Sequence, residues 1–189
     1  RKQLTNINLS DPYNYFMSFM IDDEQMRIYD FNRLVKDLNG LTINEYLLKV
    51  SEVYNVENIV NHKPIQKDEI YMYLDGNWFS LIAKSNTFDA SHCVDNLDPA
   101  ILSKNILDPI LGIKDIRNDH RIDFMDGKQG LTSLKNSVDS GDYSVAFALK
   151  PITVEQLKHV SDQSQVMPPK STYIEPKLRS GLIIYSMGS

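Results

Sequence analysis

The sequence has one cysteine and no long apolar run, and each shortage excludes a class of protein. With Cys93 alone no intrachain disulfide can form, which excludes a small secreted domain built on a disulfide framework. The apolar runs, such as residues 182–185, are far shorter than the roughly 20 residues that span a bilayer, and no secretory signal segment is apparent. These features predict a cytoplasmic protein that has no membrane partner.

Basic residues are also fewer than acidic ones. The chain has 20 lysines and arginines against 25 aspartates and glutamates, which gives a formal net charge of −5. A protein of this charge has no overall attraction to a phosphate backbone, so a nucleic-acid site would need a local basic patch. Because a recognisable helix-turn-helix is missing as well, nucleic acid is kept as an alternative partner and is not favoured.

The histidines lack the spacing of a zinc site. None of them has a second histidine or a cysteine at a chelating spacing, and the adjacent His92 and Cys93 suit no common chelate. We therefore expect no metal site with zinc and interpret Cys93 as an inert thiol. A magnesium ion held by one or two carboxylates and a substrate phosphate leaves little trace in a sequence, so Mg²⁺ stays open as a cofactor of a nucleotide-dependent reaction.

Length and composition predict a single domain. With 189 residues, of which 42% are hydrophobic, the chain can bury one core. We expect this domain to cover residues 1–189, with the polar residues 1–10 as a linker. Since the first residue is Arg1 rather than methionine, we also expect the chain to be the C-terminal portion of a longer protein.

Two hairpins are predicted from runs of aromatic and branched residues. Residues 70–74 and 78–83 flank Asp75-Gly76, and Asp-Gly between two β-rich runs is typical of a tight hairpin turn. A second hairpin is expected from residues 13–21 and 26–31, whose apolar side chains should be buried.

The remaining segments predict single helices and short strands. Thr42, with Glu45 three residues later, is a typical helix start, and apolar residues recur at helical spacing through residue 54. The other expected elements are helices over residues 95–111, with a break at Asp108-Pro109, over 131–138 and from Thr153 to 160, and strands over 122–125, 143–149 and 181–185. Hairpins mixed with single helices favour an α+β fold, in which helices pack against a mainly antiparallel mixed sheet.

Residues 167–181 form a loop whose composition suits an anion. Phosphate or carboxylate recognition needs cationic groups, hydroxyl and backbone N–H donors, and a stiff backbone, which the prolines of the loop can supply. The candidate ligand-binding residues are Lys170, Ser171, Thr172, Lys177, Arg179 and Ser180. The alternative is a solvated loop whose lysine and arginine stems cover apolar surface.

A second group of candidates is His120, Arg121 and Asp123 at the short strand. Alternate residues of a strand face the same side, so Arg121 and Asp123 are expected to share a face. In a functional interpretation Asp123 is a general base or a metal ligand, His120 carries a proton and Arg121 contacts the anion. The alternative is a structural ion pair between Arg121 and Asp123 beside an exposed histidine.

Several short motifs carry a resemblance to a known family. They are MPPKSTYIEPKLRSGL at residues 167–182, DPILG at 108–112, RIDF at 121–124, VDSG at 138–141, VAF at 145–147, YNY at 13–15 and NR at 32–33. With these motifs the chain resembles the C-terminal part of domain-of-unknown-function family 1015, bacterial proteins often labelled ParB-like or SpoOJ-like. The resemblance implies a preceding region with a Gly-His-His-Arg nucleotide motif, so the protein's own N-terminal domain is an expected partner.

The residues and the resemblance leave several functions open. The leading hypothesis is binding of an anionic small molecule or a nucleotide phosphate through residues 167–181. Because the ParB and sulfiredoxin fold includes phosphotransferases that act on small molecules such as free serine, the resemblance also implies a phosphotransferase or nucleotide hydrolase that acts with the N-terminal part. Further alternatives are DNA binding by a ParB-like partition or regulatory protein, and a structural or dimerisation domain.

Overall fold

The computed structural model describes residues 14–60 and 65–186, which divide into two compact units. One unit covers residues 28–173, and the other consists of residues 14–27 and 174–186. The single domain over residues 1–189 stays a prediction, and its linker, residues 1–10, lies outside the described part. No helix among the described residues is long and apolar enough to cross a membrane.

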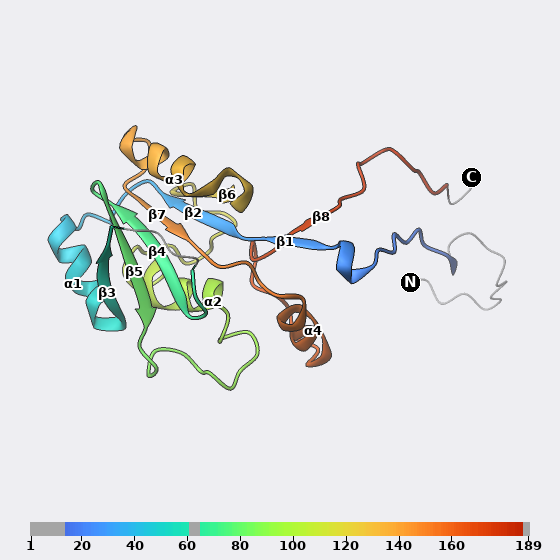
Figure 1. Cartoon of the computed structure of the whole chain (residues 1–189), viewed down its shortest axis with the longest axis horizontal. Helices are drawn as coiled ribbons and strands as arrows, with labels where there is room; N and C mark the ends of the chain where they lie inside the picture. Colours follow the sequence, from blue (N-terminus) through green and yellow to red (C-terminus); the bar gives the residue numbers. More distant parts are fainter. Residues whose placement is uncertain (1–13, 61–64, 187–189) are drawn as a thin grey trace. The chain divides into compact units, whose positions relative to one another are not determined.

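The larger unit is built on a six-stranded sheet in the order β3-β5-β4-β7-β2-β6, with antiparallel neighbours throughout (Figure 1). Its strands are β2 (Phe31–Val35), β3 (Tyr54–Ile59), β4 (Glu69–Leu74), β5 (Asn77–Ala83), β6 (Ile122–Asp126) and β7 (Val145–Ala148). A second sheet has two strands, β1 (Arg27–Tyr29) and β8 (Tyr173–Glu175).

The helices are short, and each lies between two strands that are not neighbours in a sheet. They are α1 (Ile43–Val53), α2 (Asp98–Leu102), α3 (Gly130–Asp139) and α4 (Val154–Asp162), with a π-helical turn at Ser103–Leu107 and 3-10 turns at Asp23–Gln25 and Gly127–Gln129. Helices combined with antiparallel sheets confirm the expected α+β fold.

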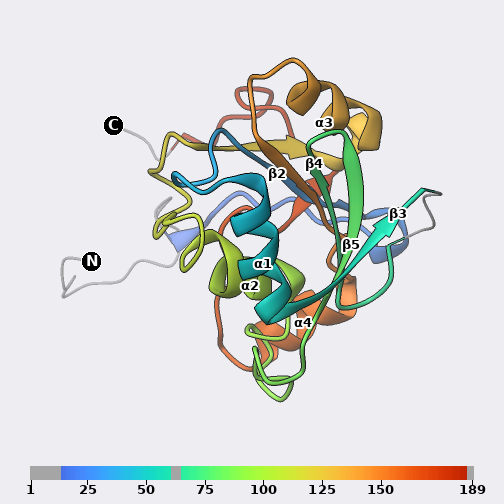
Figure 2. The same cartoon turned by 90° about the vertical axis from the view of Figure 1, so that its left-hand side faces the viewer.

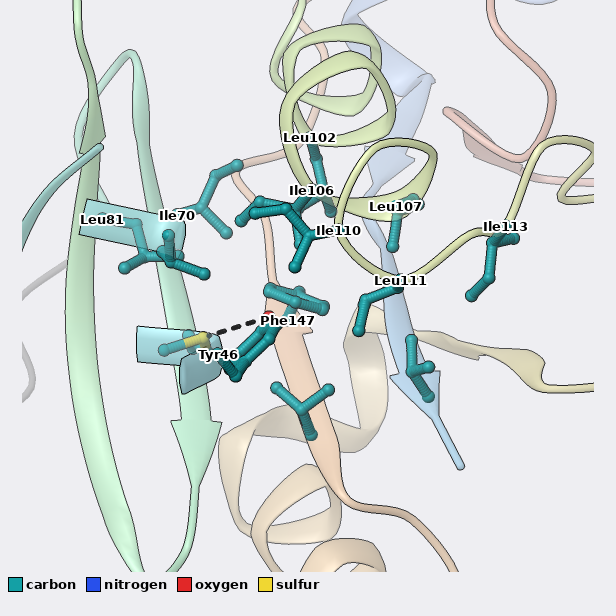
Figure 3. Close-up of a cluster of buried hydrophobic side chains, with 14 of the residues drawn as sticks. Tyr46, Ile70, Leu81, Leu102, Ile106, Leu107, Ile110, Leu111, Ile113 and Phe147 are labelled. Carbon is teal, nitrogen blue, oxygen red and sulfur yellow. Dashed lines mark hydrogen bonds between the residues drawn. The ribbon is translucent and has the colours of Figure 1, made fainter. Parts of the chain in front are cut away.

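The main core lies between one face of the sheet and a layer that contains α1, α2 and the π-helical turn (Figure 2). Met72 of β4 and Phe147 of β7 are fully buried on this face. Tyr46 and Val50 of α1 pack against it, and the Tyr46 hydroxyl donates a hydrogen bond to the Met72 sulfur at 3.7 Å (Figure 3). The segment after α2 completes the core with Ile101, Leu102, Ile106, Leu107, Ile110, Leu111 and Ile113.

The opposite face of the sheet is covered as well. Tyr71, Tyr73 and Trp78 are buried there together with Leu134 of α3. Because both faces of the central strands are covered, every residue of β7 is buried. The central strands β4 and β7 therefore carry mainly apolar and aromatic side chains on both faces instead of alternating apolar and polar residues.

The hairpin at Asp75-Gly76 is confirmed. Leu74 pairs with Asn77 across the turn, which leaves two residues in the loop. Their φ angles are 47° and 77°, and two consecutive positive φ values are what a type I′ hairpin turn requires.

The helix start at Thr42 is also confirmed. The Thr42 side chain accepts a hydrogen bond from the Glu45 backbone N–H at 3.3 Å, and the Glu45 carboxylate accepts one from the Thr42 backbone N–H at 2.9 Å. This reciprocal capping satisfies N–H groups that the first turn cannot pair internally. Thr153 caps α4 in the same way, and α3, β6 and β7 lie where helices and strands are expected.

The expected hairpin of residues 13–21 and 26–31 is wrong. Residue 13 lies outside the described residues, and residues 15–22 form no strand. Phe16 and Met20 are 84% and 88% exposed, so the expected burial is wrong too. Apolar and aromatic side chains suit the half-buried surface of a sheet, so their presence predicted strands here. A strand also needs a neighbouring strand with which to form hydrogen bonds, and composition does not supply one.

Three further elements differ from those expected from the sequence. The strand expected over residues 181–185 is absent, and Ile184 is 82% exposed. The helix expected over 95–111 begins only at Asp98, where Pro99 suits a first turn, and then changes to the π-helical turn. Neither β3 nor β8 was expected, because their sequences, YNVENI and YIE, are short or largely polar.

Candidate functional site

Two adjoining pockets of the larger unit are lined by successive residues of the proline-rich loop, and together they are called the groove here. The Lys170 pocket has a volume of about 370 Å³ and is lined by Lys36, Ile116, Arg117, Asn118, Asp119, His120, Ile122, Asp123, Phe124 and Lys170. The Met167 pocket has a volume of about 820 Å³ and is lined by Ala100, Ser103, Lys104, Asp108, Ile113, Lys114, Asp115, Ile116, Arg117, Val166, Met167, Pro168 and Pro169. Ile116 and Arg117 belong to both.

Strand pairing brings one wall of the Lys170 pocket together. Lys36 directly follows β2, and its backbone N–H donates to the carbonyl of Arg121 just before β6 at 2.9 Å. Its side chain continues along this edge, since the Lys36 ammonium donates to the His120 carbonyl at 2.9 Å and lies 3.3 Å from an Asp123 carboxylate oxygen. The antiparallel register of β2 and β6 thus joins residues more than 80 positions apart in the sequence.

The Lys170 ammonium faces aromatic rings rather than carboxylates. Its nitrogen lies 5.5 Å from the ring centre of Phe31 and 5.8 Å from that of Phe124, distances at which a cation is attracted to the ring face. The Lys170 carbonyl accepts a hydrogen bond from the Arg33 guanidinium at 2.9 Å. Within residues 14–60 and 65–186 no carboxylate forms an ion pair with Lys170, so its charge is available to an anion.

Arg33 is a buried cation beneath this loop. It is 1% exposed, and its guanidinium donates to the carbonyls of Phe31 and Lys170. Burial lowers its pKa to about 10, which the Asp30 carboxylate partly offsets. The central carbon of its guanidinium group lies 5.6 Å from the ring centre of Phe124 in β6. Through its hydrogen bond to the Lys170 carbonyl, Arg33 ties the sheet to the loop.

The acidic side chains near the groove are largely neutralised by neighbouring cations. The Arg117 guanidinium donates to Asp115 at 3.0 Å and lowers the pKa of that carboxyl to about 2. The Arg121 guanidinium donates to Asp119 at 2.8 Å and holds the pKa of that carboxyl below its usual value. These pairs keep the carboxylates ionised and leave little net negative charge in the groove.

The described part of the chain contains three groove lysines that form no ion pair: Lys104, Lys114 and Lys170. Lys104 and Lys114 are exposed on the Met167 pocket. The groove therefore combines paired charges with lysines that have no anionic partner, although the chain as a whole is acidic.

The structure brings together only some of the residues expected to form a site. Lys170, His120 and Asp123 line the same pocket although they come from two separate motifs. Ser171 is 4% exposed, and its hydroxyl donates to the Pro168 carbonyl at 2.6 Å, so it stabilises the loop. Thr172 is half-buried and stays a prediction as a ligand contact.

The last three loop candidates belong to the smaller unit. Lys177, Arg179 and Ser180 are exposed there. Their part in anion binding stays a prediction.

The expected pair between Arg121 and Asp123 is wrong. Arg121 directs its guanidinium to Asp119 and to the carbonyls of Leu111 and Gly112, because Asp119, two residues earlier, also accepts the Arg121 backbone N–H at 2.9 Å. Asp123 instead contacts Lys36 and accepts a hydrogen bond from the Tyr143 hydroxyl at 2.8 Å.

Several groove residues carried no signal in the sequence. Lys36, Lys104, Lys114 and Arg117 are isolated cations in separate segments, and only the tertiary fold brings them to one surface. Among the described residues no group of three or more histidine, cysteine, aspartate or glutamate side chains is placed to hold a metal. Magnesium stays a prediction.

Comparison with solved structures finds similarity to a free serine kinase in complex with AMP, with 13% sequence identity and a TM-score of 0.50. The similarity covers 80% of this chain and 55% of the kinase. A conserved hypothetical protein from Pyrococcus furiosus is similar over 80% of this chain and 57% of its own, with 13% identity and a TM-score of 0.48. The chain thus spans little more than half of each of these structures. At 13% identity the similarity to the kinase shows the fold alone.

Sequence comparisons show the family to which the chain belongs, which similarity to solved structures does not. No curated protein matches the chain. The ParB-like label and the placement at the C-terminal end of a longer protein stay predictions. The model of the family described as "Protein of unknown function (DUF1015)" matches residues 1–100, more than half of the sequence, so the chain belongs to this family.

Proposed function

We propose that the chain binds a nucleotide in the groove, with the phosphate groups at Lys170 and the nucleoside against Met167. The observation that carries this proposal is the set of lysines that line the groove without an ion-pair partner in the described ranges, Lys104, Lys114 and Lys170. Phosphate oxygens form their strongest hydrogen bonds with cationic donors, and cations already bound to a carboxylate are less available to them.

Lys170 is held in place before a ligand arrives. Two prolines, Pro168 and Pro169, precede it and limit the backbone, while Arg33 binds its carbonyl. The rings of Phe31 and Phe124 confine the ammonium group. Because these contacts exist in the free protein, a phosphate group would bind without the full cost of ordering a flexible lysine.

The Met167 pocket has the size and lining that a nucleoside needs. Its volume of about 820 Å³ lies within the range of typical small-molecule pockets, roughly 300–1,000 Å³. Ile113, Ile116 and Met167 supply apolar surface for a base, and Ser103 and Asp108 supply hydrogen-bonding groups. The structural similarity to a free serine kinase in complex with AMP supports a nucleotide over another phosphate compound.

Phosphoryl transfer is the second candidate function. His120 and Asp123 line the same pocket as Lys170, so a proton carrier and a carboxylate would lie beside the bound phosphate groups. Such an enzyme would use Mg²⁺ as its cofactor and the N-terminal part of the protein as its second wall. DNA binding is not proposed, because carboxylates neutralise Lys36, Arg117 and Arg121 and interrupt a basic face.

Replacing Lys170 with methionine is expected to weaken ATP binding by at least about tenfold. The change keeps most of the side chain's apolar stem and removes one charged donor, and a hydrogen bond to a charged group contributes about 1.5–3 kcal/mol. Isothermal titration calorimetry with ATP, AMP and adenosine measures the loss, which should be largest for ATP.

Lys49→Met is the matched control, because Lys49 is exposed on α1 and lines neither pocket. It should change the dissociation constant less than about twofold. Equal affinities of the wild-type protein and Lys170→Met for ATP would contradict the proposal.

A further inference from the structure

A separate cavity of about 320 Å³ lies in the larger unit and shares no lining residue with the groove. Its walls come from the turn before β4, from residues 90–98 and from the segment that leads from β7 into α4. Charged side chains of both signs line it: Lys67 and Asp68 before β4, Asp98 at the start of α2 and Lys150 after β7.

Two carboxyl groups, Asp68 and Asp98, form the acidic part of the cavity. One carboxylate oxygen of Asp68 is shielded from solvent and has no hydrogen-bond donor within the described ranges, and its other oxygen lies 4.0 Å from the Lys67 ammonium. Asp98, in the first turn of α2, is half-buried beside it. A shielded acceptor without a donor costs free energy, so a ligand that supplies a donor there is favoured.

Lys150 and the start of α4 form the basic part. Lys150 is half-buried and forms no ion pair within residues 14–60 and 65–186. Thr153 and Gln156 line the cavity at the first turn of α4, where backbone N–H groups carry the positive end of the helix dipole. This part of the cavity favours a carboxylate or another small anion.

We propose that this cavity binds a zwitterionic small molecule of the free amino acid class. The ammonium group donates to Asp68 and Asp98, and the carboxylate accepts from Lys150 and lies at the first turn of α4. The volume of about 320 Å³ is at the lower end of small-molecule pockets, which favours a ligand of this size over a nucleotide. The mixed charge of the walls favours a zwitterion over a simple anion or amine.

Proton release gives this binding a distinct signature. The pKa of Asp98 is raised to about 7, mainly by burial and secondly by the negative charge of Asp68. The positive charges of Lys150 and Lys67 partly offset this increase. Tyr54 interacts with Asp98 electrostatically. Two histidines, His92 and His159, also line the cavity. The Nδ1 atom of His92 accepts a hydrogen bond from the Asp95 backbone N–H.

A bound ammonium group favours the ionised form of Asp98. The ionised fraction grows as pH rises through about 7, so affinity should increase from pH 6 to pH 8. Binding near neutral pH should release a proton to the buffer.

Titration calorimetry with each of the twenty common amino acids tests the proposal on the whole chain. At least one of them should bind, and Asp98→Asn and Lys150→Gln should each weaken that binding by tenfold or more. Asp98→Asn should also abolish proton release, measured as the difference in heat between two buffers of unlike ionisation enthalpy. Asp162→Asn and Lys49→Gln are exposed controls outside the cavity, and each should change affinity less than twofold.

Circular dichroism of each variant reports whether it is folded, and Asp68→Asn replaces Asp98→Asn if that variant is not. Failure of every amino acid to bind the wild-type protein would overturn the proposal. Wild-type affinity in both Lys150→Gln and the aspartate-to-asparagine variant used, Asp98→Asn or Asp68→Asn, would overturn it as well, because the ligand would then lie elsewhere.

Discussion

Replacing Phe147 with alanine is expected to lower the free energy of unfolding by about 3–5 kcal/mol, as large-to-small changes of buried aromatic residues do. Phe147 is fully buried in β7, and it pairs with Met72 of β4 on one side and Arg33 of β2 on the other. Alanine at this position leaves a void at the centre of the sheet that rigid neighbours on both strands cannot fill. Urea unfolding, followed by the fluorescence of the single tryptophan, Trp78, measures the change.

Phe16→Ala is the control for this experiment, because Phe16 is 84% exposed and its removal should change stability by less than about 0.5 kcal/mol. A loss below about 1 kcal/mol for Phe147→Ala would show that β7 is not the central strand of the core.

Replacing Arg33 with alanine is expected to cost about 2–4 kcal/mol, because it leaves the carbonyls of Phe31 and Lys170 without a donor and opens a cavity beneath Phe124. Arg33→Met should cost less than the alanine variant. Methionine fills part of the space that alanine leaves empty. It also removes a buried positive charge, and that charge is costly because burial lowers the arginine pKa to about 10.

Urea unfolding of both Arg33 variants gives the comparison, and ATP titration of the methionine variant adds a functional readout. Since Arg33 holds the Lys170 carbonyl, its loss should also weaken nucleotide binding. Wild-type stability in Arg33→Ala would mean that the buried guanidinium does not tie the loop to the sheet.

Local sequence signals predicted those elements whose ends are specified by nearby residues. The hairpin at Asp75-Gly76 and the helix that begins after Thr42 depend on contacts between residues three positions apart, and such contacts can be predicted from the sequence. The strands expected over residues 13–21 and 181–185 depend on a partner that composition cannot identify. Their exposed apolar side chains show that β-rich composition alone does not form a strand.

The groove could be predicted only in part, for a similar reason. The prolines and charge of residues 167–170 identified Lys170 as a candidate, and His120 and Asp123 were identified from a separate motif. Lys36 and Arg117 have no distinctive neighbours in the sequence. Lys36 reaches the groove because β2 and β6 pair in an antiparallel register, and Arg117 reaches it from the segment before β6. Both placements are long-range properties of the fold.

The most direct test of nucleotide binding in the groove is an NMR titration with ATP of protein that carries ¹³C-labelled isoleucine and methionine methyl groups. The resonances of Ile113, Ile116 and Met167, which line the Met167 pocket, should shift with a common dissociation constant. Those of Ile70 and Met72, in the core, should stay in place. Saturating ATP that leaves the three groove resonances unchanged would contradict a nucleotide site in this groove.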